Sequence, residues 1–169
     1  MPHIPAEPTA EQAQAAIDAF EQAGADLVVA VGGGSVIDVA KLAAVSAGHT
    51  VRQMLRNPAL AKKTVPMLAI PTTAGTGAEA TPNAIVALPE QELKVGIVSA
   101  TMLPDAVVLD PAMTGTLPKA VAASTGVDAL CHAIECYTSA KATPMSNLFA
   151  LEAMRLIFSG ILPACQQAD

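Results

Sequence analysis

The sequence is poor in aromatic and in charged residues. It has no tryptophan, one tyrosine and three phenylalanines among 169 residues, and charged residues make up 14%. The net charge is -6 and no cluster of lysine or arginine occurs. Because nucleic-acid-binding proteins present basic surfaces and aromatic rings for base stacking, no nucleic-acid partner is expected. With so few aromatics, the core must be built from alanine, valine, leucine, isoleucine and methionine.

Cysteines are few, and long uninterrupted apolar runs are missing. Three cysteines without a framework spacing indicate reduced thiols, as in cytosolic proteins. No run reaches the ~18 apolar residues that cross a bilayer, so no membrane partner is expected. The start, MPHIPAEPTAEQ, lacks the basic and apolar regions of a signal peptide. With 52% hydrophobic residues, the sequence predicts a globular, cytoplasmic protein.

Helix and strand patterns alternate over the first two thirds of the chain. Thr9 and Gln12 form a capping box that begins a helix, and Gly24 ends it. Apolar, β-branched runs predict buried strands at 26–31, 65–70 and 106–110, with a strand pair between the last two and a buried helix at 35–47. This alternation predicts an α/β fold with a doubly wound parallel sheet.

From Pro118 onward every pattern is helical. The change predicts two domains, a partial nucleotide-binding α/β domain at 1–112 and the start of an all-helical, metal-binding domain at 113–169. The α/β part begins with a helix where a strand is expected, and the helical part is too short to enclose a core. The chain is therefore expected to be a fragment lacking both ends.

The stretch VVAVGGGSVIDVAK has the order strand, glycine turn, helix. Three glycines let the backbone approach a ligand closely, and a helix N-terminus supplies free N–H groups for phosphate. The stretch is not the G-x-G-x-x-G fingerprint of dinucleotide sites. A plain strand–helix turn, in which Ser35 caps the helix and Asp38 completes a capping box, therefore stays open as the alternative.

The stretch PTTAGTGAE follows a buried strand and carries Thr72, Thr73 and Thr76. Ligands of open α/β sheets bind outside the carboxyl ends of the strands, where both glycine-containing loops fall. A mere solvent loop would more often be charged, so the pattern favours ligand binding. Lys94 opens a strand and can reach a phosphate or ribose; the alternative is a solvated lysine at the end of a hairpin.

The stretch GVDALCHAIECYTS places Asp128 and His132 four residues apart in an apolar helix. This spacing puts two side chains on one helix face, where they can bind one metal ion. Alternatively, Asp128 caps the helix and His132 packs against a neighbour. Glu135 and Cys136 continue a similar stripe and are further candidate ligands.

Four stretches together closely resemble the iron-containing (group III) alcohol dehydrogenases: GGGSVIDVAK, PTTAGTGAEATPNAIV, LPDAVVLDPAMTGTLPKAVAASTGVDALCHAIECYTS and ALEAMRLI. The resemblance extends over nearly the whole chain. It implies a nucleotide-binding α/β domain and a helical domain with cofactor and metal between them. It also implies a set of cofactor-binding residues, namely Gly33, Gly34, Ser35, Asp38, Thr72, Thr73, Thr76 and Lys94.

By the same resemblance, Asp128 and His132 match the first two of four metal ligands. The other two are histidines further along, and they have no counterpart here. The implied cofactors are Fe²⁺, or Zn²⁺, and NAD or NADP. The complete enzyme is expected to be a homo-oligomer that acts on a small alcohol or aldehyde, whereas this chain alone is expected to be inactive.

The implied reaction is reversible hydride transfer between a primary alcohol and nicotinamide, with the metal as Lewis acid. Zinc-dependent glycerol dehydrogenase and dehydroquinate synthase share the implied fold and stay open, as does a non-catalytic remnant. The unbroken TTAGTGAE loop favours the iron-containing branch. Maleylacetate reductase would be expected to lack the metal pair.

Overall fold

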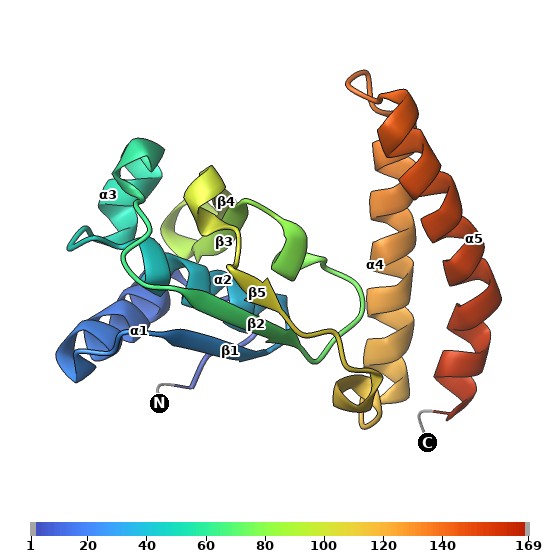
Figure 1. Cartoon of the computed structure of the whole chain (residues 1–169), viewed down its shortest axis with the longest axis horizontal. Helices are drawn as coiled ribbons and strands as arrows, with labels where there is room; N and C mark the ends of the chain where they lie inside the picture. The colour runs from blue at the N-terminus through green and yellow to red at the C-terminus, as the bar shows by residue number, and fades with distance from the viewer. Residues whose placement is uncertain (1–2, 168–169) are drawn as a thin grey trace. The chain divides into compact units, whose positions relative to one another are not determined.

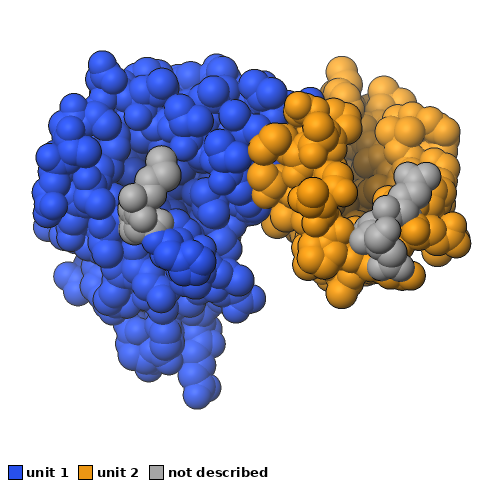
Figure 2. Space-filling view, turned by 90° about the horizontal axis from the view of Figure 1, so that it is seen from below, with its two compact units in different colours: residues 1–71, 78–109 blue, residues 72–77, 110–169 orange. Residues whose placement is uncertain are grey.

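The computed structural model describes residues 3–167, which divide into two compact units (Figure 2). The first, called here the α/β unit, holds the described residues up to 71 together with 78–109. The second, called the helical unit, holds residues 72–77 and the described residues from 110 onward. The threonine loop thus groups with the helices, although it leaves a strand of the α/β unit. The domain bounds 1–112 and 113–169 stay a prediction.

Helix α1 (Ala10–Ala23) begins and ends as the sequence predicts. The Gln12 amide N–H donates to the Thr9 hydroxyl at 3.2 Å, and the Thr9 N–H donates to the Gln12 side chain at 2.9 Å. Gly24 ends the helix in the left-handed conformation, at φ 57°. Both predicted signals are therefore confirmed, because each depends only on neighbouring residues.

The sheet of the α/β unit is parallel, as predicted (Figure 1). Strand β1 (Val28–Gly32) pairs with β2 (Met67–Pro71), and β2 pairs with β5 (Ala106–Val107). The last strand is shorter than predicted. Only two of its residues pair in the ladder, although the Val108 N–H still donates to the Ala69 carbonyl at 2.9 Å.

Helix α2 (Gly34–Val45) connects β1 to the rest of the unit and covers one face of the sheet. Ile37 and Ala44 pack in one buried cluster with Val28 and Met67. Most of the helix is buried, as its all-round apolar sequence predicts.

Most other elements of the α/β unit pack against α1 or α2. The predicted strand pair is an antiparallel hairpin of β3 (Asn83–Leu88) and β4 (Leu93–Val98), and the polar connection at 49–63 contains α3 (Val51–Arg56). Short 3₁₀ helices complete the described chain: η1 (Pro58–Leu60), η2 (Ala78–Ala80), η3 (Pro89–Gln91), η4 (Ala100–Met102) and η5 (Pro111–Thr114).

The helical unit consists mainly of α4 (Lys119–Thr138) and α5 (Pro144–Gln167), which lie side by side (Figure 1). Gly126 permits their close approach, because a Cβ atom there would lie 2.9 Å from the Ile161 side chain.

Within the described residues, α5 is long and apolar enough to cross a membrane over Pro144–Gln166. The expectation that no segment reaches this length is therefore wrong. The only charged residues in this segment are Glu152 and Arg155, and its mean hydropathy is 1.6. One such helix, judged by length and composition alone, is weak evidence for a membrane span.

The outer face of β1 generates a prediction about association. Val29 and Val31 point away from α2 and are 42% and 49% exposed. Exposed valines on an edge strand promote pairing between chains. We expect the 169-residue chain to self-associate in sedimentation velocity, and Val29→Thr/Val31→Thr to shift it toward monomer.

The control for this experiment is Val98→Thr, which changes a valine in the separate hairpin that is even more exposed, at 61%. It should leave the distribution unchanged. A monomeric unsubstituted chain, or equal effects of both substitutions, would contradict the assignment of association to β1.

Candidate cofactor and metal site

The glycine turn joins the end of β1 directly to α2. A Cβ atom on Gly32 would lie 2.7 Å from the Val36 side chain, so only glycine fits there. Gly33 is the N-cap residue of α2, in an extended conformation. The Val36 and Ile37 N–H groups donate to the Gly33 carbonyl at 3.0 and 3.1 Å.

The predicted capping box of Ser35 and Asp38 is wrong. Helix α2 begins at Gly34, and no side chain caps it. The physical reason is that Gly33 already adopts the extended N-cap conformation, which places Ser35 inside the first turn. The Ser35 hydroxyl instead accepts the Glu7 N–H at 3.2 Å. An uncapped helix N-terminus is the arrangement that receives phosphate in nucleotide-binding proteins.

Asp38 is nearly buried inside the α/β unit, where its carboxylate accepts two hydrogen bonds. One comes from the Ile85 N–H at 3.0 Å and the other from the Lys41 ammonium at 3.2 Å. Burial raises the pKa of the Asp38 carboxyl, while these two donors oppose the rise. A cofactor contact of Asp38 stays a prediction; its observed hydrogen bonds join α2 to β3.

Lys94 lies at the start of β4 and forms an ion pair with Glu7. Glu7 adopts a positive φ of 54°, and it contacts two predicted cofactor-binding residues, Ser35 through its N–H and Lys94 through its carboxylate. Sequence reasoning missed Glu7 because it lies 87 residues from Lys94. No local spacing signals such a pair.

The threonine loop leaves β2 beside the glycine turn. Pro71, the last residue of β2, is the register partner of Gly32, so both loops begin at the same edge of the sheet. Further along, Gly75 packs against α4 within the helical unit, and a Cβ atom on it would lie 2.6 Å from the Thr125 carbonyl oxygen. The threonine loop therefore starts at the carboxyl end of β2, and its Gly75 contacts α4.

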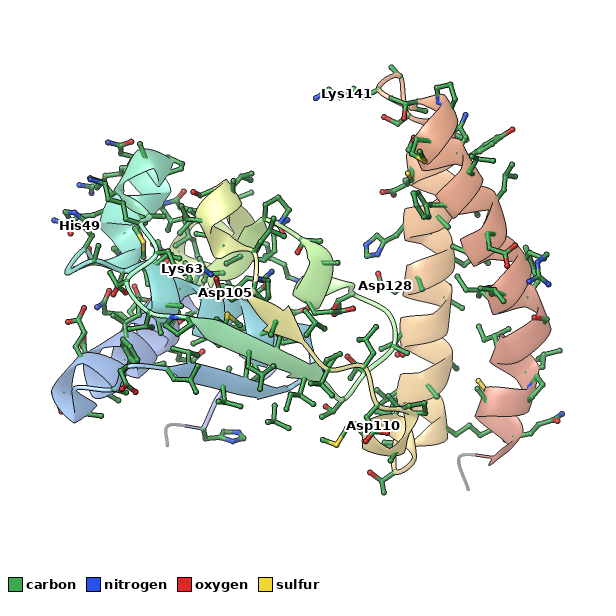
Figure 3. All side chains as sticks on the ribbon, viewed as in Figure 1. His49, Lys63, Asp105, Asp110, Asp128 and Lys141 are labelled. Carbon is green, nitrogen blue, oxygen red and sulfur yellow. The ribbon has the colours of Figure 1, made fainter. Side chains whose placement is uncertain are left out.

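Asp128 and His132 lie on one face of α4, with Asp128 labelled in Figure 3. The distance from His132 Nε2 to Asp128 Oδ1 is 3.7 Å, and the side chains are 53% and 45% exposed. The alternative of a cap and a packed histidine is not supported, because Asp128 lies well inside α4 and His132 is accessible to solvent.

This pair fits two positions of a divalent metal site. Carboxylate oxygen and imidazole nitrogen bind such ions at about 2.0–2.2 Å, so two ligands of one ion lie within about 4 Å of each other. Among residues 3–167, no group of three histidine, cysteine, aspartate or glutamate side chains is arranged to bind a metal. Glu135 and Cys136 therefore do not complete the site.

These observations define a class: an α/β protein with an uncapped glycine turn, followed by a helix that carries an aspartate and a histidine on one face. The family model for iron-containing alcohol dehydrogenase matches residues 1–111, and that for the C-terminal part of the Fe-containing alcohol dehydrogenase family matches residues 122–169. The chain belongs to the iron-containing alcohol dehydrogenase family.

Known relatives support this assignment in sequence and in structure. An alcohol dehydrogenase of Thermococcus barophilus is 35% identical over 98% of this chain. The crystal structure of an iron-containing alcohol dehydrogenase of Thermotoga maritima is 37% identical, with a TM-score of 0.89 over 98% of this chain. The structure of a Bifidobacterium kashiwanohense sulfoacetaldehyde reductase in complex with NAD⁺ is 29% identical, with a TM-score of 0.88 over 98%.

The chain spans less than half the length of each of these relatives. It covers 46% of the Thermococcus barophilus enzyme, 46% of the Thermotoga maritima structure and 45% of the Bifidobacterium structure. Helix α5 lies within residues 122–169, which match the family's C-terminal part. The fold and the family are therefore shown for this chain, and the activity of a whole enzyme is a matter for proposal.

The contact of Gly75 with α4 generates a prediction about stability. Gly75→Ala would force Cβ against the Thr125 backbone, and such overpacking costs about 1–3 kcal/mol. We expect urea unfolding to show a loss of this size. The matched control is Gly160→Ala in α5, where no atom lies within 4 Å of the new Cβ. That change should leave stability equal or raise it by up to about 1 kcal/mol, and equal losses in both variants would contradict the packing argument.

Proposed function

We propose that this chain provides the cofactor loops and two metal ligands of an iron-containing, NAD-dependent alcohol dehydrogenase. The reaction is hydride transfer between a primary alcohol or aldehyde and the nicotinamide. The observation that carries the proposal is the exposed pair of Asp128 and His132, 3.7 Å apart on α4, in a stretch that matches the family's C-terminal part.

Asp128 and His132 would hold the metal from one side. Their positions on successive turns of a rigid helix fix both donors before the ion arrives, which lowers the ordering cost of binding. The metal, when bound, supplies Lewis-acid chemistry that makes the alcohol easier to deprotonate and the aldehyde easier to reduce. Two ligands do not saturate an ion, so positions stay open for other ligands and for substrate.

The α/β unit would bind the dinucleotide. Gly33, Gly34 and Ser35 present the uncapped start of α2 to the pyrophosphate, where backbone N–H groups and the helix dipole favour negative charge. Lys94 adds a positive charge near Ser35, since both side chains contact Glu7. Thr72, Thr73 and Thr76 are proposed as further cofactor contacts, because their loop begins where β2 ends beside β1.

Support for the dehydrogenase is stronger than for its rivals. The two family models that match the chain are both of iron-containing alcohol dehydrogenases, which disfavours a dehydroquinate synthase-like lyase. Iron and NAD agree with the family's description and with the NAD⁺ complex of a relative. Zinc and NADP remain alternatives for experiment, as does a non-catalytic role. A homo-oligomer and a cytoplasmic location are also proposed.

The metal assignment predicts the effect of His132→Ala. Because an imidazole ligand is lost and a lone carboxylate binds weakly, we expect binding of Fe²⁺ or Zn²⁺ to fall at least about tenfold. The measurement is isothermal titration of the metal-free chain, with circular dichroism to check the fold. Binding should be weak even before substitution, and chelator should strip the metal readily.

The control is His49→Ala, which removes a histidine of the α/β unit and should leave metal binding unchanged. Equal metal binding by the His132→Ala and unsubstituted chains would contradict the metal assignment. Unfolding of the His132→Ala variant alone would favour a structural histidine instead.

The nucleotide assignment predicts the effect of Gly33→Val. A branched side chain at the N-cap of α2 would stand where the backbone must approach pyrophosphate. We expect the Kd of NADH, followed by nicotinamide fluorescence, to rise at least about tenfold. The measurement is made in the full-length protein, meaning this chain together with any residues that flank it. The far-UV circular dichroism of the variant should equal that of the unsubstituted protein. An unchanged Kd in the folded variant would count against the glycine turn as the phosphate site.

A further inference from the structure

Lys41 is a charged residue in the middle of the buried helix α2, and its side chain is fully buried, at 0% exposure. All three ammonium protons have acceptors. Lys41 Nζ donates to Asp38 Oδ1 at 3.2 Å, to Thr81 Oγ1 at 3.1 Å and to the Asn83 carbonyl oxygen at 2.8 Å. An ammonium group has three donors and no acceptor, so this one is fully satisfied.

Stability alone is a poor explanation for this arrangement. Taking an ammonium and a carboxylate out of water costs several kcal/mol per ion, and buried pairs are often no better than apolar residues of similar volume. Burial accordingly lowers the pKa of the Lys41 ammonium, against the opposing effect of Asp38. A buried pair also fixes the relative positions of its partners, because its hydrogen bonds form only when donor and acceptor groups are correctly placed.

The partners of the pair lie at informative places in the chain. Asp38 Oδ2 accepts the Ile85 N–H at 3.0 Å, and the Thr81 hydroxyl donates onward to the Ala78 carbonyl at 3.2 Å. Residues 78–85 are the segment that follows the threonine loop and enters β3. Helix α2, which carries Lys41 and Asp38, begins at the glycine turn. One buried network thus joins the helix behind the first loop to the segment after the second.

We propose that Lys41 is a positioning residue for the cofactor site: together with Asp38 and Thr81, it holds the exit of the threonine loop at a fixed place relative to α2. This proposal rests on the proposed function, in which both loops contact the dinucleotide. Lys41 is buried and acts only through Thr81, Asn83 and Asp38. Its loss therefore disorders the segment 78–85 and weakens nucleotide binding, without removing a group that touches the cofactor.

A test of this role needs a second ion-paired lysine whose partners lie outside the loops. Lys63 provides it, because its ammonium also donates to one carbonyl and one carboxylate: the Leu103 oxygen at 2.7 Å and Asp105 Oδ2 at 3.0 Å (Figure 3). The compared variants are Lys41→Met and Lys63→Met, which remove the same charge. Thr81→Val is a milder variant that keeps the ion pair and removes only the hydroxyl relay.

Two measurements are made on each full-length variant. Hydrogen exchange followed by mass spectrometry should show peptides covering 78–85 exchanging at least about tenfold faster in Lys41→Met, and about threefold faster in Thr81→Val. In Lys63→Met these peptides should exchange as in the unsubstituted protein. The Kd of NADH should rise at least about tenfold in Lys41→Met, about threefold in Thr81→Val and less than twofold in Lys63→Met.

Each outcome decides the matter. Unchanged exchange at 78–85 in both Lys41→Met and Thr81→Val would overturn the proposal. It would also be overturned if the Kd of NADH rose by the same factor in Lys41→Met and Lys63→Met, because that result describes a purely structural residue. If Lys41→Met fails to fold, Thr81→Val carries the same comparison. If the unsubstituted protein fails to bind NADH, the proposed function is contradicted, and exchange still decides whether Lys41 holds this segment.

Discussion

Parallel pairing of β1 with β2 is the constraint on which the rest of the structure depends. Five residues of each strand pair in register, from Val28 with Met67 to Gly32 with Pro71. Parallel strands need a crossover connection, and α2 lies within this one and covers the sheet. The same pairing makes both strands end at one edge, so the glycine turn and the threonine loop begin side by side. Gly32 and Pro71, which are 39 positions apart in the sequence, thereby become neighbours.

Glycines allow close approach of neighbouring segments at two places in the structure. Gly32 lies against Val36 at the turn, and Gly75 lies against Thr125 in the helical unit. A Cβ atom at either glycine would come within 3 Å of its neighbour, which core packing does not tolerate without a shift. The glycines thus serve two purposes: Gly32 and Gly75 let the backbone approach a neighbouring residue closely, and Gly33 begins a helix that no side chain caps.

Sequence reasoning succeeds where local signals decide and fails where distant residues compete. The capping box of Thr9 is local, and the structure confirms it. The analogous capping box at Ser35 and Asp38 has the right spacing, yet it does not form. Gly33 is the N-cap residue, and the Asp38 carboxylate accepts hydrogen bonds from Lys41 and Ile85 instead. The parallel sheet follows from the alternation of patterns.

Other features had no signal in the sequence. Nothing in the sequence predicted that β5 is short, because pairing in a ladder depends on the partner strand as well as on β-branched residues. Glu7 and the network of Lys41 are joined to their partners across 28 to 87 residues, so no motif shows them. Spacing on one helix was enough to suggest Asp128 and His132 as a metal pair, and the structure places both side chains on one exposed face of α4; their role as ligands stays a proposal. Among residues 3–167, no third histidine, cysteine, aspartate or glutamate side chain is arranged with them.

The central claim is that the loops after β1 and β2 serve one dinucleotide. Its most direct test is hydrogen exchange of the unsubstituted full-length protein with and without saturating NAD⁺, resolved to peptides covering 32–38 and 71–77. If both loops contact the cofactor, NAD⁺ slows exchange in both peptides and leaves α3 unchanged. Protection of only one of the two peptides, or of neither while NAD⁺ is bound, would contradict the account.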